Sequence, residues 1–139
     1  MSELEEKFLW YWHELAQGYP EPEREYRFAA YYVGIGRGVT KRLRDAGLRD
    51  WRFDFAWPMT MKAHHKQSAD FILYIAMPVA AEVHGGIWKG GHQKKRFIED
   101  RHKINAAISL GWKVYEFTAD MLKDDPAACI ELVKEALNK

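Results

Sequence analysis

Two acidic residues, Asp54 and Glu82, stand out because each lies inside a short run of apolar residues. Asp54 is part of RFDFAW (52–57) and Glu82 is part of VAAEVH (79–84), and both runs have the composition of buried strands. A carboxylate in such a place is costly unless it is paired or bound to a cation. If the two strands converge at one edge of a sheet, Mg²⁺ can offset their repulsion. Such an ion suits phosphodiester hydrolysis, because it polarises the phosphate and lowers the pKa of an attacking water.

Each acid also has a simpler structural interpretation. Asp54 can pair with Arg52 on the same strand face, and Glu82 can pair with a lysine from the crossover that begins at Gly85. His84 leaves the strand on the same face as Glu82. Its imidazole can accept a proton from metal-bound water or ligate the metal, and the alternative is a strand-end histidine bonded to backbone.

A further carboxylate is expected from an N-terminal helix at residues 3–16, where apolar residues recur at helical spacing. Glu5 lies on the apolar side of this helix, and Glu6 lies nearer its flank. Ser2 has the pattern of an N-cap with Glu5 three residues later. Either glutamate can support the site or serve only at the helix N-terminus, where acids are favourable.

Basic residues are the candidates for phosphate contact. Arg101 lies on the apolar stripe of a helix expected at 93–110, so its guanidinium needs a carboxylate or a phosphate as partner. The other candidates are cations or amides on the same helix or on the glycine-rich segment before it: Lys89, His92, Lys94, Lys95, Arg96, Lys103 and Asn105.

Composition restricts the class of protein. The 139 residues suit one domain, 1–139, and 47 % of them are hydrophobic. A single cysteine, Cys129, excludes an internal disulfide framework and fits a reducing cytoplasm. The first residues lack the pattern of a signal peptide, and no apolar run is long enough to cross a bilayer. The net charge of +1 conceals basic blocks at 37–52 and 84–103, which indicate an anionic partner such as DNA or else solvated surface.

The order of expected elements predicts an α/β domain with a mixed central β-sheet flanked by helices. Within 50–57, the alternation places Trp51, Phe53, Phe55 and Trp57 on one face. Residues 59–69 are expected to be a polar loop. Helices are further expected at 39–46 and from Pro126 to about Leu137, and strands at 25–33, 50–57, 70–76, 79–84 and 112–117.

The order Asp54, then Glu82-Val83-His84, resembles the split signature of the PD-(D/E)XK nuclease superfamily, with histidine where that family usually has lysine. The run from His84 to Trp88 is similar to very-short-patch repair endonucleases. RFDFAWP, KINAA (103–107) and GWKV (111–114) are similar to small phage-type endonucleases and Holliday-junction resolvases.

This resemblance implies a restriction-endonuclease-like core of order α-β-β-β-α-β, with residues 59–77 as an insertion. It implies that Asp54 and Glu82 bind Mg²⁺, with Mn²⁺ able to substitute, and that hydrolysis of DNA leaves a 5′-phosphate. The expected substrate is branched or distorted duplex DNA in a bacterial or phage-infected cell. Cutting two strands symmetrically calls for a homodimer. The alternatives are a mismatch-directed nicking enzyme, a non-catalytic DNA-binding protein on the same fold, and an interaction module with merely solvated basic blocks.

Overall fold

A four-stranded mixed sheet forms the centre of the computed structural model, which describes residues 1–58, 61–65, 71–75, 77–85 and 91–138. The strands are β1 (Glu23–Tyr26), β2 (Phe53–Trp57), β5 (Val79–His84) and β6 (Lys113–Thr118), and they lie in the order β1-β2-β5-β6. β2 pairs antiparallel with both β1 and β5, whereas β5 and β6 are parallel. The expected α/β architecture with a mixed central sheet is therefore confirmed.

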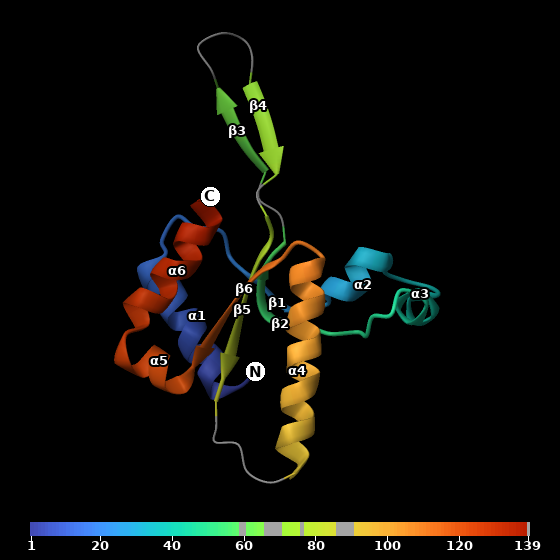
Figure 1. The fold of residues 1–139 in the computed structure, drawn as a ribbon. Coiled ribbons are helices and arrows are strands. Elements are labelled where there is room, and N and C mark those ends of the chain that lie inside the picture. Colours follow the sequence, from blue (N-terminus) through green and yellow to red (C-terminus); the bar gives the residue numbers. More distant parts are fainter. Residues whose placement is uncertain (59–60, 66–70, 76, 86–90, 139) are drawn as a thin grey trace.

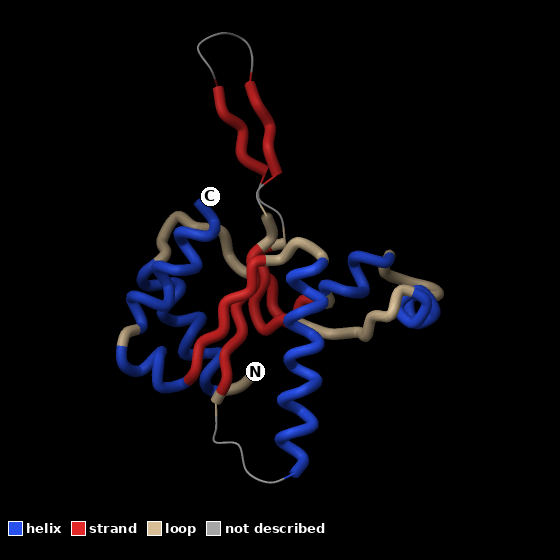
Figure 2. The backbone as a smooth tube through the Cα atoms, viewed as in Figure 1, coloured by secondary structure: helices blue, strands red, loops and turns tan. Residues whose placement is uncertain are grey.

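Helices cover both faces of this sheet (Figures 1 and 2). The helices α1 (Glu3–Leu15), α5 (Ala119–Asp124) and α6 (Pro126–Asn138) pack on one face around Phe8, Trp12 and Ile130. The other face carries α2 (Phe28–Val33), α3 (Val39–Asp45) and α4 (Gly91–Ser109), which pack around Phe28, Phe53 and Trp112. The sheet is thus the middle layer between two hydrophobic clusters.

The connection from β5 through α4 to β6 positions the polar residues described below. Because β5 and β6 are parallel, Glu82 lies directly beside Glu116 in the register of the sheet. Ala107 of α4 is fully buried against the same face. The apolar side predicted for this helix does not face the sheet. Phe97 and Ile108 are largely exposed, and the side of α4 toward the sheet carries Lys103 and Ala107 instead.

Two expected segments have a different structure. The strand expected at 25–33 is wrong beyond Tyr26, because residues 28–33 form α2, in which Phe28, Ala29 and Ala30 are all buried. The loop expected at 59–69 is wrong for residues 61–65, which form β3 (Met61–His65). β3 pairs antiparallel with β4 (Phe71–Ile75), and this two-stranded hairpin extends away from the main sheet (Figure 1).

The alternation expected along 50–57 breaks at Asp54. Phe55 and Trp57 lie in the cluster with Phe8, whereas Phe53 lies in the cluster on the opposite face. The backbone pairing of β2 with β5 begins at Phe55, and at Asp54 the backbone N–H donates to a side chain of β5 instead. The alternation of side chains between the two faces is therefore interrupted at the residue that carries the central carboxylate.

The helix ends follow the sequence signals. Ser2 and Glu5 form the expected capping box of α1, and α6 begins at Pro126 directly after Asp125. In the parts of the chain that the structure describes, no helix has the length and apolar character needed to cross a membrane.

Candidate functional site

Asp54 and Glu82 lie side by side where β2 and β5 separate. The backbone N–H of Asp54 donates to Oε2 of Glu82 over 2.9 Å, and the backbone N–H of Val83 donates to Oδ2 of Asp54 over 2.9 Å. Each carboxylate therefore replaces a strand carbonyl as acceptor for the other strand. The two acids that the sequence places 28 residues apart are brought together. Arg52, the simpler partner considered for Asp54, is exposed, and its positive charge acts on the neighbouring Glu25, where it partly offsets the burial that raises the pKa of that group.

Two more carboxylates reach Asp54 from neighbouring elements. Glu5 of α1, Glu25 of β1 and Asp54 each offer one oxygen, and these oxygens lie within 4.8 Å of one another. Glu5 is held by the N–H of Ser2 over 3.2 Å and by Arg24 over 3.3 Å. Glu25 has a positive φ of 51°, which is unusual for a residue with a side chain. Hard oxygen ligands of this kind fit Mg²⁺ better than any softer metal.

The electrostatics of the cluster are those of acids that lack a sufficient counter-charge. Burial, then the negative charge of Glu82 and a hydrogen bond shared with its carboxyl, raise the pKa of Asp54 to about 7. Burial, together with the charges of Glu5 and Asp54, also raises the pKa of Glu25. Burial acts in the same direction on Glu5, but hydrogen bonds from Ser2 and Arg24 outweigh it and leave its pKa below the usual range. A divalent cation would favour the ionised form of all three groups.

Glu82 is the only charged residue that is fully buried among those described, and its partner is Lys103 of α4. The ammonium group of Lys103 binds Oε1 of Glu82, and its side chain is itself 14 % exposed. The Nζ atom lies 5.5 Å from the centre of the Phe53 ring. Glu82 thus has a lysine partner, as the simpler interpretation held, but from helix α4 rather than from the start of the crossover.

His84 forms part of a second, adjacent group. Its Nε2 atom lies 2.9 Å from Oε1 of Glu116, and the same oxygen accepts a hydrogen bond from Arg101 over 2.9 Å. The alternative of a strand-end histidine bonded only to backbone is therefore wrong. Arg101 thus pairs with a carboxylate, one of the two partners expected for it, although its side chain is 42 % exposed.

Two hydrogen-bond donors at the site lack an acceptor. Within the described ranges, the buried side-chain nitrogen or oxygen atoms without a partner are Nε of Arg24 and Nε of Arg101. Arg24 binds Glu5 and Arg101 binds Glu116, so both donors flank the carboxylates. Both Nε atoms are shielded from solvent, so an external acceptor reaches them only if the side chains move.

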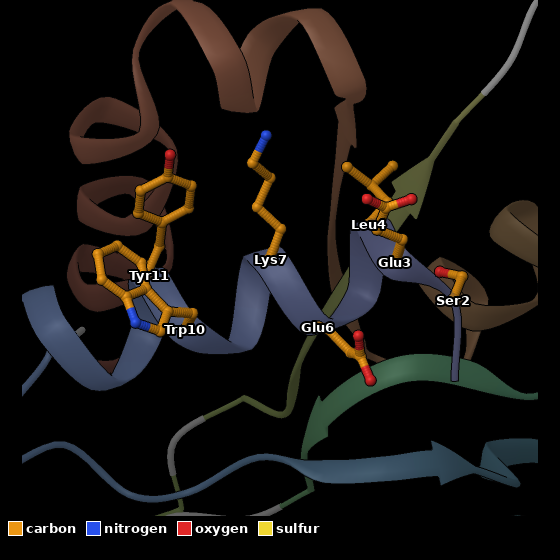
Figure 3. Close-up of a pocket in the computed structure, with 7 residues that line it drawn as sticks. All are labelled: Ser2, Glu3, Leu4, Glu6, Lys7, Trp10 and Tyr11. Atoms are coloured by element: carbon orange, nitrogen blue, oxygen red, sulfur yellow. The ribbon is translucent and has the colours of Figure 1, made fainter.

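The remaining predicted residues lie further out or are not described. Glu6 is exposed and lines an open groove on α1 with Lys7 and Trp10 (Figure 3). Among the described residues it is not a member of the acidic group of Glu5, Glu25 and Asp54. Lys89 lies outside the described residues, and His92 lies in the first turn of α4, where its side chain is not described. The other members of the basic set are exposed on α4: Lys94, Lys95, Arg96 and Asn105.

Sequence reasoning missed Glu25 and Glu116. Glu116 had a usable signal, because parallel strands carrying one acid each can bring the two acids into register. No sequence signal pointed to Glu25, since its position depends on a positive φ within a short strand.

The chain matches no protein-family model, and it has no significant match among curated proteins or solved structures. What the site can do is therefore derived from its own residues.

Proposed function

We propose that this protein is a Mg²⁺-dependent endodeoxyribonuclease. The observation that supports this most is the meeting of Asp54 and Glu82 between two strands, with Glu5 and Glu25 beside Asp54 and cations on the facing helix. Among the residues that the structure describes, the ion pairs to these four acids are those of Arg24 with Glu5 and of Lys103 with Glu82, and two such pairs alone do not explain why so many acids are gathered.

The order of elements is consistent with a restriction-endonuclease-like core. When α2, α3 and the β3–β4 hairpin are left out, the chain runs α1-β1-β2-β5-α4-β6 and then continues into α5 and α6, so the order α-β-β-β-α-β is followed by two further helices. The hairpin falls within residues 59–77, the proposed insertion. Asp54 lies on the second of these core strands and Glu82 on the third, as the split PD-(D/E)XK signature requires.

Each residue has a role that follows from its position. Asp54 and Glu82 are the proposed metal ligands. Glu5 and Glu25 are the two further carboxylates, because an oxygen of each lies within 4.8 Å of an oxygen of Asp54. Bound there, Mg²⁺ supplies Lewis acidity and a water of lowered pKa. Arg101, whose side chain is 42 % exposed, is the proposed donor to a phosphate oxygen.

His84 is the proposed proton acceptor. When its Nε2 carries the hydrogen that Glu116 accepts, Nδ1 is the basic atom of the ring. Glu116 then fixes the orientation of the imidazole, and it acts as a positioning residue rather than a catalytic one.

Branched DNA is the proposed substrate, in the manner of a Holliday-junction resolvase acting as a homodimer. The exposed cations of α4, Lys94, Lys95 and Arg96, suit a phosphate backbone and carry no base preference of their own. Selection by shape of the DNA is consistent with that chemistry. A mismatch-directed nicking enzyme of the very-short-patch repair type is the second candidate.

One panel of DNA substrates tests the proposal. End-labelled four-way junction, mismatched duplex and matched duplex are incubated with the protein in Mg²⁺, in Mn²⁺ and in EDTA. We expect metal-dependent cleavage of the junction with 5′-phosphate ends. Cleavage of the mismatched duplex alone would select the second candidate, and metal-independent binding without cleavage of any substrate would reject the enzyme in favour of a DNA-binding protein.

A further inference from the structure

Both oxygens of Glu82 are already engaged in the structure. Oε2 accepts the backbone N–H of Asp54, and Oε1 binds the ammonium of Lys103. The Glu82 side chain is only 5 % exposed, so neither of its oxygens is open to a further partner from solvent. A metal ion that uses Glu82 must therefore compete with a cation that belongs to the protein.

We propose that Lys103 is a counter-ion that a divalent cation has to displace from Glu82, and that a DNA phosphate makes this displacement favourable by taking over the ammonium. The inference rests on the proposed function, because it concerns the same metal and the same DNA. It assigns to Lys103 the coupling of metal binding to DNA binding.

The surroundings of Lys103 support an exchange of partners. An ammonium and a divalent cation on one buried carboxylate repel each other strongly, because the local dielectric is low. A lysine that simply left Glu82 would be a partly buried charge without a partner, which is unfavourable. The flexible side chain of Lys103 lets Nζ rotate away from Oε1 of Glu82. The adjacent Phe53 ring can stabilise the ammonium by a cation–π contact while it moves.

An arriving phosphate changes this balance. Its negative charge replaces that of Glu82 as the partner of Lys103, so Glu82 becomes available to the metal. By thermodynamic linkage, the metal must then increase the affinity for DNA by the same factor as DNA increases the affinity for the metal. The free protein accordingly binds metal weakly, and the complete site assembles only on its substrate.

The competing interpretation is that Lys103 is a structural ion pair or merely one positive charge near the acids. Arg101 provides the matched control for charge. It lies two residues away on the same helix and carries the same charge, but it binds Glu116 rather than Glu82. Lys103 differs from Arg101 in binding Glu82 directly, and its side chain is 14 % exposed against 42 % for Arg101.

Binding of Mn²⁺ without DNA, followed by calorimetry, tests the inference on wild type, Lys103→Met and Arg101→Met. We expect Lys103→Met to bind Mn²⁺ about tenfold more tightly than wild type, and Arg101→Met to change the affinity by less than about twofold. Equal affinities for wild type and Lys103→Met would overturn the inference, as would an equal gain in Arg101→Met.

A second arm measures the coupling itself. The affinity for a fluorescent four-way junction is compared with and without Ca²⁺, which takes the same kind of oxygen ligands. We expect the enhancement by Ca²⁺ to be about tenfold smaller in Lys103→Met than in wild type. An undiminished enhancement would overturn the inference. If neither wild type nor Lys103→Met binds Mn²⁺ at millimolar concentration, the metal site and the proposed function fail together; if both bind it equally, only the inference fails.

Removing Lys103 leaves a buried acid, so a second variant guards against loss of the fold. Lys103→Gln keeps a hydrogen-bond donor for Oε1 of Glu82 and removes the charge. Circular dichroism establishes that each variant is folded before its binding is measured. If Lys103→Met is unfolded, the same gain in Mn²⁺ affinity is expected from Lys103→Gln, and its absence there would overturn the inference.

Discussion

Replacing Asp54 by asparagine is expected to stabilise the metal-free protein at pH 8. Asparagine has nearly the same shape, and its Oδ1 can still accept the backbone N–H of Val83 that Asp54 accepts over 2.9 Å. What it lacks is the negative charge beside Glu82, Glu5 and Glu25. The gain in stability comes from the removal of that repulsion and of the cost of burying an ionised group.

The size and sign of the effect follow from the pKa of Asp54, which is raised from 3.8 to about 7, mainly by burial and by the charge of Glu82. Between these two pH values the folded protein keeps the proton and the unfolded chain loses it, so the free energy of unfolding falls as the pH rises. Each pH unit corresponds to about 1.4 kcal/mol, which gives the wild type a penalty of at most about 4 kcal/mol above pH 7. Below pH 4 the carboxyl is protonated in both states, and the variant gains nothing there.

Urea unfolding in EDTA at several values between pH 4 and 8.5 measures this directly. The advantage of Asp54→Asn over wild type should be near zero at pH 4 and should grow to between about 2 and 4 kcal/mol at pH 8. Asp50→Asn is the matched control. Hydrogen bonds from Arg27 hold the pKa of Asp50 below its usual range, so its contribution is present above the unfolded pKa and is lost as the pH falls. That variant should be slightly less stable than wild type at pH 8.

A loss of stability in Asp54→Asn that is the same at pH 4 and pH 8 would refute this reasoning. Such a result would mean that Asp54 acts in the apoprotein as an ordinary hydrogen-bonded strand residue. The absence of charge repulsion would also remove the physical reason for placing a cation there.

Three further predictions concern the helix cap, the basic helix and the core. Glu5→Ala should lower the free energy of unfolding by about 1 kcal/mol and impair cleavage, because Glu5 completes the capping box of α1 and reaches Asp54. Glu6 is exposed, and Glu6→Ala should change neither property. Thermal unfolding and a cleavage assay distinguish the two variants. The combined Lys94→Ala, Lys95→Ala and Arg96→Ala variant should reduce the slope of log affinity for DNA against log salt by up to about 3, and an unchanged slope would exclude these residues from phosphate contact. Phe53→Ala should cost about 3 to 5 kcal/mol of unfolding free energy, because this fully buried ring stacks on Phe28 at 4.2 Å; a loss below 1 kcal/mol by urea unfolding would contradict that packing.

The approach of Asp54 to Glu82 was predictable because each residue was a carboxylate in an apolar run, and because antiparallel neighbours could bring them to one edge. The helix caps at Ser2 and Pro126 were predictable for the same local reason, since capping depends on residues within one turn. These features depend on local chemistry that the sequence displays directly.

The features that were not predictable depend on tertiary structure. Phe53 and Phe55 share a face in an ideal strand, but the two rings enter different clusters on either side of Asp54, whose backbone N–H donates to the Glu82 carboxylate. Residues 28–33 are apolar enough for a strand, yet they pack as a helix because that places Phe28, Ala29 and Ala30 together in the core. The pairing of Lys103 with Glu82 required knowledge of which side of α4 faces the sheet, and the exposed Phe97 and Ile108 obscured that side.

The most direct test of the central claim, that acids from separate strands hold a metal for DNA hydrolysis, is cleavage of an end-labelled four-way junction in Mg²⁺ by wild type, Asp54→Asn and Asp50→Asn. Wild type and Asp50→Asn are expected to cut at similar rates. Asp54→Asn is expected to bind the junction and leave it intact, although it is the more stable protein at pH 8. Cutting by Asp54→Asn at the rate of wild type would contradict the claim.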